Sequence, residues 1–171
     1  MTVPGDAFRF REATNILKGK DPLPTLIGDV FGTVQRSIRT LYLTDNAGEI
    51  GLDSLLVATF REMGATVNLV VKEDPFFEDA TMKDALFFSM DKLVDNIFTV
   101  NGFFIPGRST SQLSDIFKNS DLVIAKGTGN YEALKGELQG KKIVYLLKVK
   151  CKPISTDIGA PVGTFVVKVE K

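Results

Sequence analysis

The sequence contains no histidine, no tryptophan and a single cysteine, Cys151. The lack of histidine excludes Ser-His-Asp and Cys-His catalytic devices and histidine-ligated zinc sites. One cysteine excludes a disulfide within the chain, and a reducing cytoplasm is the expected compartment. Cys151 itself is expected to be a small buried residue rather than a nucleophile. Any catalysis must therefore use carboxylates, amides, hydroxyls, lysines, backbone dipoles or a bound metal.

Net charge and long apolar runs are also absent. Lysine and arginine together number 21, as do aspartate and glutamate. This balance gives no electrostatic reason to expect nucleic acid or an anionic membrane as a partner. No apolar run approaches the ~20 residues that span a bilayer, and no signal-peptide pattern opens the chain. The 171 residues fit one domain with a sizeable core.

What is present is an alternation of apolar, β-rich runs with helical patterns, which is typical of βα units and a mostly parallel sheet. We expect strands at Thr40–Thr44, Thr66–Val71, Lys92–Val100, Leu122–Lys126, Lys142–Leu147 and Gly163–Val169. We expect helices at Leu52–Met63, Thr81–Phe88, Ser111–Phe117 and Tyr131–Leu138.

The first 38 residues have a different pattern. Two helices are expected there, Asp6–Lys18 and Leu23–Ile38. A segment this short buries too little apolar surface to fold alone. The predicted organisation is therefore a short, dependent helical segment at 1–38 followed by an α/β domain at 39–171.

Polar side chains follow the first predicted strand of that domain. Asp45 and Asn46 end an apolar run, and a helical pattern begins near Glu49. Open α/β sheets bind ligands at the carboxyl ends of their strands, and carboxylate and amide oxygens suit hard divalent cations. Asp45 and Asn46 are thus candidate metal ligands, and Glu49 is a candidate to position water or a substrate hydroxyl. The alternative is that Asp45 and Asn46 form a turn and cap the helix.

Acids follow the next predicted strand in the same way, at Glu78 and Asp79. Asp79 is either a third oxygen ligand or the N-cap of the following helix. Because neighbouring parallel strands bring their carboxyl ends together, Asp45 and Asp79 can meet across the edge of the sheet.

Two further strands end in lysine-bearing stretches. After Leu122–Lys126, Gly127 and Gly129 allow backbone N–H groups to approach an anion, and Lys126 adds positive charge; a plain tight turn is the alternative. At the end of Lys142–Leu147, Lys148 can reach an anion in the crevice. Lys150 and Lys152 are expected to be surface lysines beyond the strand.

Taken in order, the four stretches resemble the damage-control phosphatases, once called domain of unknown function 89. The motifs are Asp-Asn-Ala-Gly-Glu-Ile, Pro-x-x-Glu-Asp-Ala-Thr, Lys-Gly-x-Gly-Asn-Tyr-Glu and Leu-Leu-Lys-x-Lys-Cys. The resemblance runs from about Arg39 to Val169. Each motif is weak alone, but the four in sequence are specific.

The resemblance implies a Rossmann-like three-layer α/β/α fold and a divalent-metal-dependent phosphatase. Family substrates are small phosphorylated metabolites such as sugar phosphates, and manganese, cobalt, nickel or magnesium supports activity. Metal ligands would fall on Asp45, Asn46 and Asp79. Substrate contacts would fall on Glu49, Lys148 and the turn comprising Thr128, Gly129, Asn130, Tyr131 and Glu132.

This resemblance agrees with the chemistry of the residues. A cation held by Asp45, Asn46 and Asp79 would neutralise a phosphoryl oxygen and activate water for in-line attack. Direct attack by Asp45 is the alternative. Lys148 and the amides near Thr128 would hold the remaining phosphate oxygens.

The chain also departs from the family pattern. Glu78 stands where asparagine is usual, and the Cys-x-x-Cys pair of a longer helical N-terminal region is absent. These departures favour a second hypothesis, a non-catalytic module that binds a phospho-ligand or nucleotide. A Rossmann-like methyltransferase or dehydrogenase is disfavoured, because no Gly-x-Gly-x-x-Gly turn follows the first strand. Most of the phenylalanines are expected in the core, and the others would suit a homo-oligomer contact.

Overall fold

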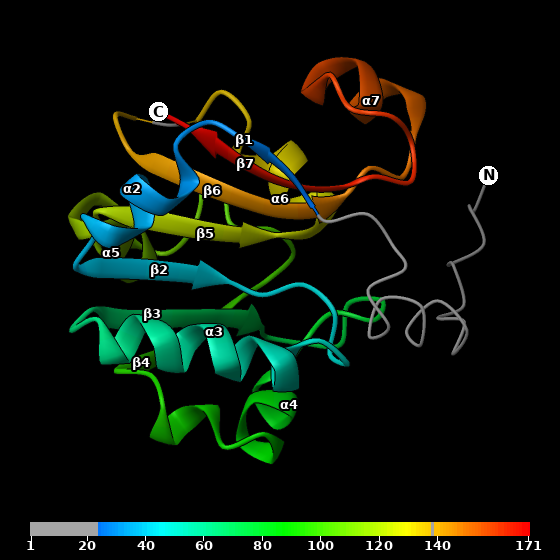
Figure 1. Ribbon diagram of the computed structural model, residues 1–171. Helices are drawn as coiled ribbons and strands as arrows, with labels where there is room; N and C mark the ends of the chain where they lie inside the picture. The colour runs from blue at the N-terminus through cyan, green and yellow to red at the C-terminus, as the bar shows by residue number, and fades with distance from the viewer. Residues whose placement is uncertain (1–23, 138) are drawn as a thin grey trace.

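The computed structural model describes residues 24–137 and 139–171. Its centre is a seven-stranded sheet in the spatial order β1-β7-β6-β5-β2-β3-β4 (Figure 1). The strands are β1 (Thr25–Ile27), β2 (Arg39–Leu43), β3 (Thr66–Lys72), β4 (Asn96–Val100), β5 (Leu122–Lys126), β6 (Lys142–Lys148) and β7 (Phe165–Glu170).

Strands β2 to β6 run parallel to one another, whereas β7 pairs antiparallel with β6 and β1 pairs parallel with β7. The chain builds outward from β2 to β3 and β4 on one side and returns to add β5 and β6 on the other. The sheet therefore has a topological switch between β2 and β5, where open α/β sheets place their ligand crevice. The carboxyl ends of these strands lie at the right-hand edge in Figure 1.

Helices cover both faces of the sheet. On one face, Val57 and Phe60 of α3 and Met90 of the short 3₁₀ helix η1 pack against the strands. On the other, Phe117 of α5, Leu134 of α6 and other apolar residues form a second core. The helical elements are α2 (Val30–Gln35), α3 (Ile50–Glu62), α4 (Met82–Phe87), η1 (Met90–Lys92), α5 (Ser111–Asn119), α6 (Gly127–Leu134) and α7 (Lys152–Ile158).

The predicted fold class, a three-layer α/β/α arrangement with a mostly parallel sheet, is confirmed. β5 matches its prediction at both ends, and β2, β3 and β6 match within one residue. These strands are buried on both faces, and β5 is buried at every position. A continuous apolar run is the pattern that such strands require, which explains the agreement.

The predicted helix at Leu23–Ile38 is wrong in its described part. Thr25–Ile27 forms β1 against β7, and a helix of only six residues follows after Gly28 and Asp29. The Asp29 side chain accepts from the Gly32 N–H and so caps this helix, which begins at Val30 rather than at Leu23. The predicted helix Asp6–Lys18 lies outside the described residues. The division at residue 38 stays a prediction, although from Pro24 onward the segment before it contributes β1 to the common sheet.

Three other boundaries need correction. The strand expected from Lys92 begins only at Asn96, because Met90–Lys92 forms the 3₁₀ helix η1. The last predicted strand begins at Phe165 rather than Gly163. The helix expected from Tyr131 already begins at Gly127 and ends at Leu134, because the glycine-rich turn itself forms the first helical turn.

Helix α7 was not predicted. It begins after Cys151 with Pro153 in its first turn and ends at Gly159, where φ is +77°. These are ordinary helix start and stop signals. Cys151 is exposed, so its predicted burial is wrong. Within the described residues, no helix is both long and apolar enough to cross a membrane.

Candidate functional site

The loop after β2 carries the first predicted ligands to the edge of the sheet. Asn46 forms the turn there, since its side-chain oxygen accepts from the Gly48 N–H at 2.8 Å. Glu49 directly precedes α3 and makes no capping hydrogen bond to it. Asn46 therefore makes a turn, and the Asp45 carboxylate remains available for another role. The ligand role of both residues stays a prediction.

The loop after β3 is joined to this loop through its backbone. The Ala47 N–H donates to the Glu78 carbonyl and the Ala80 N–H donates to the Asp45 carbonyl, both at 2.7 Å, which forms an antiparallel bridge between Asn46 and Asp79. The Asn46 side-chain amide also donates to the Glu78 carboxylate at 3.2 Å. The backbone thus brings together the three residues predicted as metal ligands.

Asp79 does not cap the helix that follows it. Thr81 is the N-cap of α4, and its backbone N–H and hydroxyl both donate to Asp84. The Asp79 carboxylate faces Lys72 instead, 3.3 Å from its Nζ atom. The structure therefore excludes the capping role that the sequence left open for Asp79.

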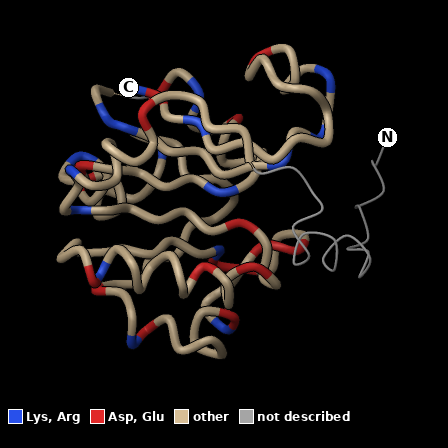
Figure 2. The backbone as a smooth tube through the Cα atoms, in the orientation of Figure 1, with Lys and Arg blue, Asp and Glu red and all other residues tan. Residues whose placement is uncertain are grey.

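The acids at this edge repel one another. Burial, the Asp79 carboxylate and the Glu49 carboxylate together raise the pKa of Asp45 to about 6. Burial also raises the pKa of Asp79, against the opposing effect of Lys72. Within residues 24–137 and 139–171, no lysine or arginine forms an ion pair with Asp45 and no side chain donates a hydrogen bond to it. Figure 2 shows acidic residues gathered in the loops at this edge.

Lys126, the last residue of β5, is neutralised by two acids. Its Nζ atom lies 2.6 Å from both Glu49 and Asp53, and 11% of its side chain is exposed. Burial lowers the pKa of Lys126, but Asp53 and Glu49 outweigh burial and raise it overall. Lys126 therefore holds Glu49 and α3 in place, and its charge is already compensated. A substrate contact by Lys126 stays a prediction.

Lys72, the last residue of β3, was not singled out from the sequence. Its side chain is 5% exposed, donates to the Gly102 carbonyl and lies over the ring of Phe103. Burial lowers its pKa, against the opposing effect of Asp79. The signal that could have found it is a lysine that ends an otherwise apolar strand, since β3, β5 and β6 all end in lysine.

The first turn of α6 closes the site from the β5 side. Gly127 has φ +79°, and a Cβ atom there would lie 2.1 Å from the Asp45 carboxylate. Asp45 therefore sits directly against Gly127, the first residue of this helix. A helix N-terminus favours negative charge and offers free N–H groups.

The remaining predicted substrate residues of α6 have other environments. Asn130 is buried, and its amide donates to the carbonyls of Thr44 and Lys126, which ties α6 to β2. Tyr131 is buried and donates to Asp157 of α7. Glu132 is exposed. A role for these three in substrate binding stays a prediction.

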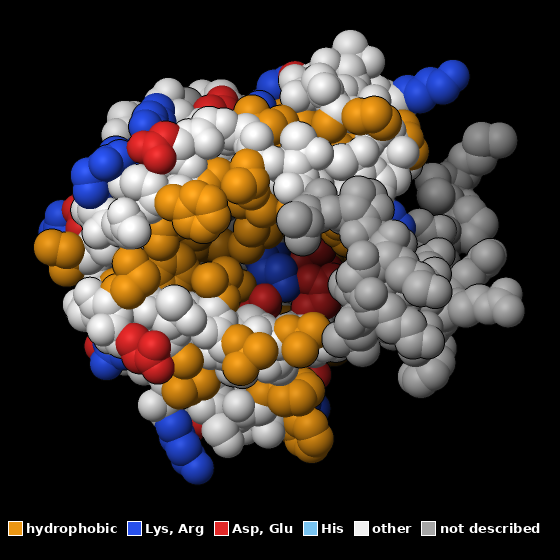
Figure 3. All heavy atoms as spheres, viewed as in Figure 1, with side chains coloured by type: hydrophobic (Ala, Val, Ile, Leu, Met, Phe, Trp, Pro, Cys, Tyr) orange, Lys and Arg blue, Asp and Glu red, His pale blue; other side chains and the backbone are white. Residues whose placement is uncertain are grey.

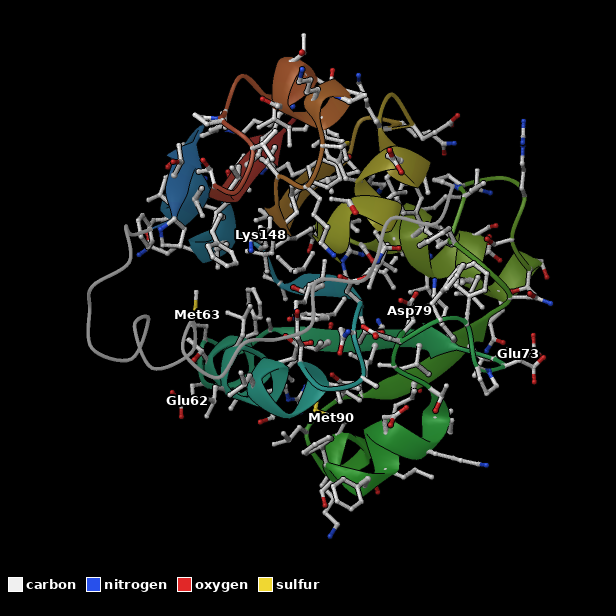
Figure 4. The ribbon with its side chains drawn as sticks, turned by 90° about the vertical axis from the view of Figure 1, so that its right-hand side faces the viewer. Glu62, Met63, Glu73, Asp79, Met90 and Lys148 are labelled. Carbon is white, nitrogen blue, oxygen red and sulfur yellow. The ribbon has the colours of Figure 1, made fainter. Side chains whose placement is uncertain are left out.

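Lys148 ends β6 at the same edge. Figure 4 looks onto this edge, with Asp79 on the β3 side and Lys148 on the β6 side. The Lys148 Nζ atom lies 5.5 Å from the centre of the Phe165 ring. Figure 3 shows acidic and basic side chains meeting in a depression between two apolar areas.

The residues present fit a hard divalent cation in donor type and in charge. Asp45 and Asp79 are oxygen donors that raise each other's energy when both are ionised, and Asn46 adds an amide oxygen. The described residues contain no group of three or more His, Cys, Asp and Glu arranged as a metal site. The candidate ligands Asp45, Asn46 and Asp79 do not form such a group, because one of the three is an asparagine.

The geometry agrees with comparisons to known proteins. The family model described as the damage-control phosphatase ARMT1-like domain matches residues 12–166. The chain belongs to this damage-control phosphatase family.

Curated relatives support the membership. The chain is 40% identical over 136 residues to a damage-control phosphatase of Archaeoglobus fulgidus, covering 77% of this chain and 46% of that protein. It is 35% identical over 141 residues to a damage-control phosphatase of Pyrococcus horikoshii, covering 81% of this chain and 49% of that one. The chain thus spans about half the length of the curated relatives it matches.

A solved structure of the same family confirms the fold. The crystal structure of a domain-of-unknown-function-89 protein from Pyrococcus horikoshii superposes with a TM-score of 0.81 at 29% identity. The match covers 96% of this chain and 60% of that one. The resemblance inferred from four short motifs is therefore confirmed at the level of family and fold.

Proposed function

We propose that this chain is a divalent-metal-dependent phosphatase that hydrolyses small phosphorylated metabolites such as sugar phosphates. The observation that carries the proposal is the convergence of Asp45, Asn46 and Asp79 beside the first turn of α6. This convergence lies at the topological switch of the sheet. Membership of the damage-control phosphatase family supports the same activity.

Asp45, Asn46 and Asp79 would hold the cation, for which manganese, cobalt, nickel and magnesium are candidates. When bound, it would supply charge neutralisation at a phosphoryl oxygen and make water more acidic. Glu49, held by Lys126, would orient the attacking water or a substrate hydroxyl. Attack by Asp45 itself is the alternative route.

The phosphate group would lie between two sources of positive potential. The N–H groups of Thr128 and Gly129 begin α6, and Lys148 approaches from the end of β6. Amides and an ammonium group placed in advance stabilise the charge of the phosphoryl group in the transition state. The remainder of the metabolite would extend toward the depression in Figure 3.

A binding module without turnover is the second candidate. The Glu78 carbonyl accepts from the Ala47 N–H in the loop bridge, and its carboxylate accepts from the Asn46 amide, so an extra acid stands beside the candidate ligands.

The deciding experiment measures phosphate release from sugar phosphates and p-nitrophenyl phosphate with Mn²⁺, Co²⁺, Ni²⁺, Mg²⁺ or EDTA. Metal-dependent release that is lost in Asp45→Asn and kept in Asp91→Asn, an exposed aspartate of η1, supports the phosphatase. Ligand binding by folded protein, without release under any metal, supports the binding module instead.

A further inference from the structure

We propose that Lys72 is a built-in counter-cation of the acidic site. It neutralises Asp79 while no divalent cation is bound, and it thereby sets how tightly the site takes one up. This inference rests on the proposed metal-dependent function and extends it to a residue that the sequence motifs did not include.

The Lys72 ammonium group is buried beside one carboxylate, and its other contacts carry no net charge. Its Nζ atom lies 3.3 Å from Asp79 Oδ2, and its side chain is 5% exposed. Its other contacts are the Gly102 carbonyl and the rings of Phe103 and Phe76, 4.0 Å and 5.5 Å from the ring centres. Carbonyl oxygens and aromatic faces stabilise a cation without cancelling its charge. Asp79 is therefore the only carboxylate in the described structure within ion-pair distance of Lys72.

The charges of the whole site leave room for a divalent cation. Asp45, Glu49, Asp53 and Asp79 form the acidic cluster, and the two buried ammonium groups are those of Lys72 and Lys126. Four carboxylates against two lysines leave two negative charges, and Glu78 beside Asn46 adds a third, so the site keeps a net negative charge that a divalent cation would reduce. The charge of Lys150 also lowers the pKa of Asp45 and of Asp79, but Lys150 is exposed, so water and salt screen its charge.

Lys72 and Lys126 differ in whether the carboxylates that they contact are candidate metal ligands. Lys126 contacts Glu49 and Asp53, which are not candidate ligands. Lys72 contacts Asp79, which is one. A cation held by Asp79 would share that carboxylate with the Lys72 ammonium group, and the two positive charges would repel at short range. Lys72 would therefore weaken metal binding and, in return, keep the metal-free loops from repelling each other.

The experiment compares wild type, Lys72→Met and Lys72→Arg. Titration calorimetry gives the dissociation constant for Mn²⁺, and melting temperatures are recorded in EDTA and in saturating Mn²⁺. Methionine is unbranched like lysine and replaces most of its apolar stem, without its charge. We expect Lys72→Met to bind Mn²⁺ about tenfold more tightly and to melt about 5 °C lower in EDTA. In saturating Mn²⁺ the difference in melting temperature should largely disappear, because the metal then supplies the missing charge.

Two controls separate this role from a general loss of charge or packing. Lys92→Met removes an exposed lysine of η1 and should change neither measurement. Lys72→Arg keeps the charge and should bind Mn²⁺ within about threefold of wild type. If Lys72→Met does not fold, Lys72→Gln takes its place.

Three results would overturn the inference while leaving the proposed function intact. They are unchanged Mn²⁺ affinity in Lys72→Met, weaker Mn²⁺ affinity, or an equal loss of melting temperature with and without metal. A higher KM for substrate at unchanged Mn²⁺ affinity would make Lys72 a substrate contact. Wild type that binds no divalent cation would instead overturn the proposed function, and this inference with it.

Discussion

The two sides of the topological switch treat a buried lysine in opposite ways. On the β5 side, Lys126 meets two carboxylates at 2.6 Å, so the lysine is fully neutralised. On the β3 side, Lys72 meets one carboxylate at 3.3 Å, together with a carbonyl and an aromatic ring. β2 lies between them and presents Asp45, which has no ion-pair partner in the described chain.

This difference separates a structural half of the site from an adjustable one. The Lys126 cluster joins β5 to α3 whether or not a ligand is present. The Asp79 carboxylate, by contrast, can be shared between Lys72 and an incoming cation. The similar sequence context of the two lysines, each ending a buried strand, hides this difference.

The largest expected effect comes from Asp45, between the two halves. Asp45→Asn should lower metal-dependent phosphate release by about 1,000-fold or more, because it removes an oxygen anion from the metal site. Steady-state kinetics with saturating metal checks this, with Asp91→Asn as the matched control. Near-normal turnover in Asp45→Asn would remove Asp45 from the site.

On the β5 side, Lys126→Met should destabilise the fold by about 3 kcal/mol, because it leaves Glu49 and Asp53 uncompensated. Urea unfolding should show the same loss of unfolding free energy in EDTA and in Mn²⁺. For Lys72→Met, by contrast, Mn²⁺ should remove the loss. A loss that Mn²⁺ repairs would show that Lys126 also belongs to the adjustable half.

Gly127→Ala tests the contact between α6 and Asp45. The added Cβ atom would lie 2.1 Å from the carboxylate and would strain a backbone with φ +79°. We expect turnover to fall about 100-fold, because displacement of a reacting group by about an ångström costs this much. Gly159→Ala, at an equally left-handed position with no atom near the added Cβ, is the control for backbone strain. Equal turnover in the two variants would contradict the contact.

A smaller effect concerns the pH dependence of the metal-free protein. The pKa of Asp45 is raised from 3.8 to about 6, so the folded state binds more protons than the unfolded chain between these values. The stabilising contribution of its protonated form is therefore present below the lower value and lost as the pH rises through the upper one. As the pH rises through this window, the free energy of unfolding of the wild type should fall by at most about 3 kcal/mol relative to that of Asp45→Asn. Urea unfolding of both proteins from pH 4 to 7 in EDTA measures it, and parallel curves would refute the shift.

Sequence reasoning reached the central strands and the order of the motifs because both are local signals. β5 was placed at both ends, and the three candidate ligands Asp45, Asn46 and Asp79 do converge. It did not reach β1, because an edge strand of only three residues leaves no periodic pattern. It also missed α7, although Pro153 and Gly159 mark its ends.

By itself, the sequence determined the chemistry available to this protein. It excluded histidine chemistry, placed acids and amides after apolar strands, and carried four motifs that identified the family. Only the tertiary structure decided what each charge does, because the partners of Lys72 and Lys126 come from other loops and helices. An ion pair depends on distances across the sheet, and those distances are set by the packing of β5, β2 and β3 rather than by any neighbouring residue in the chain.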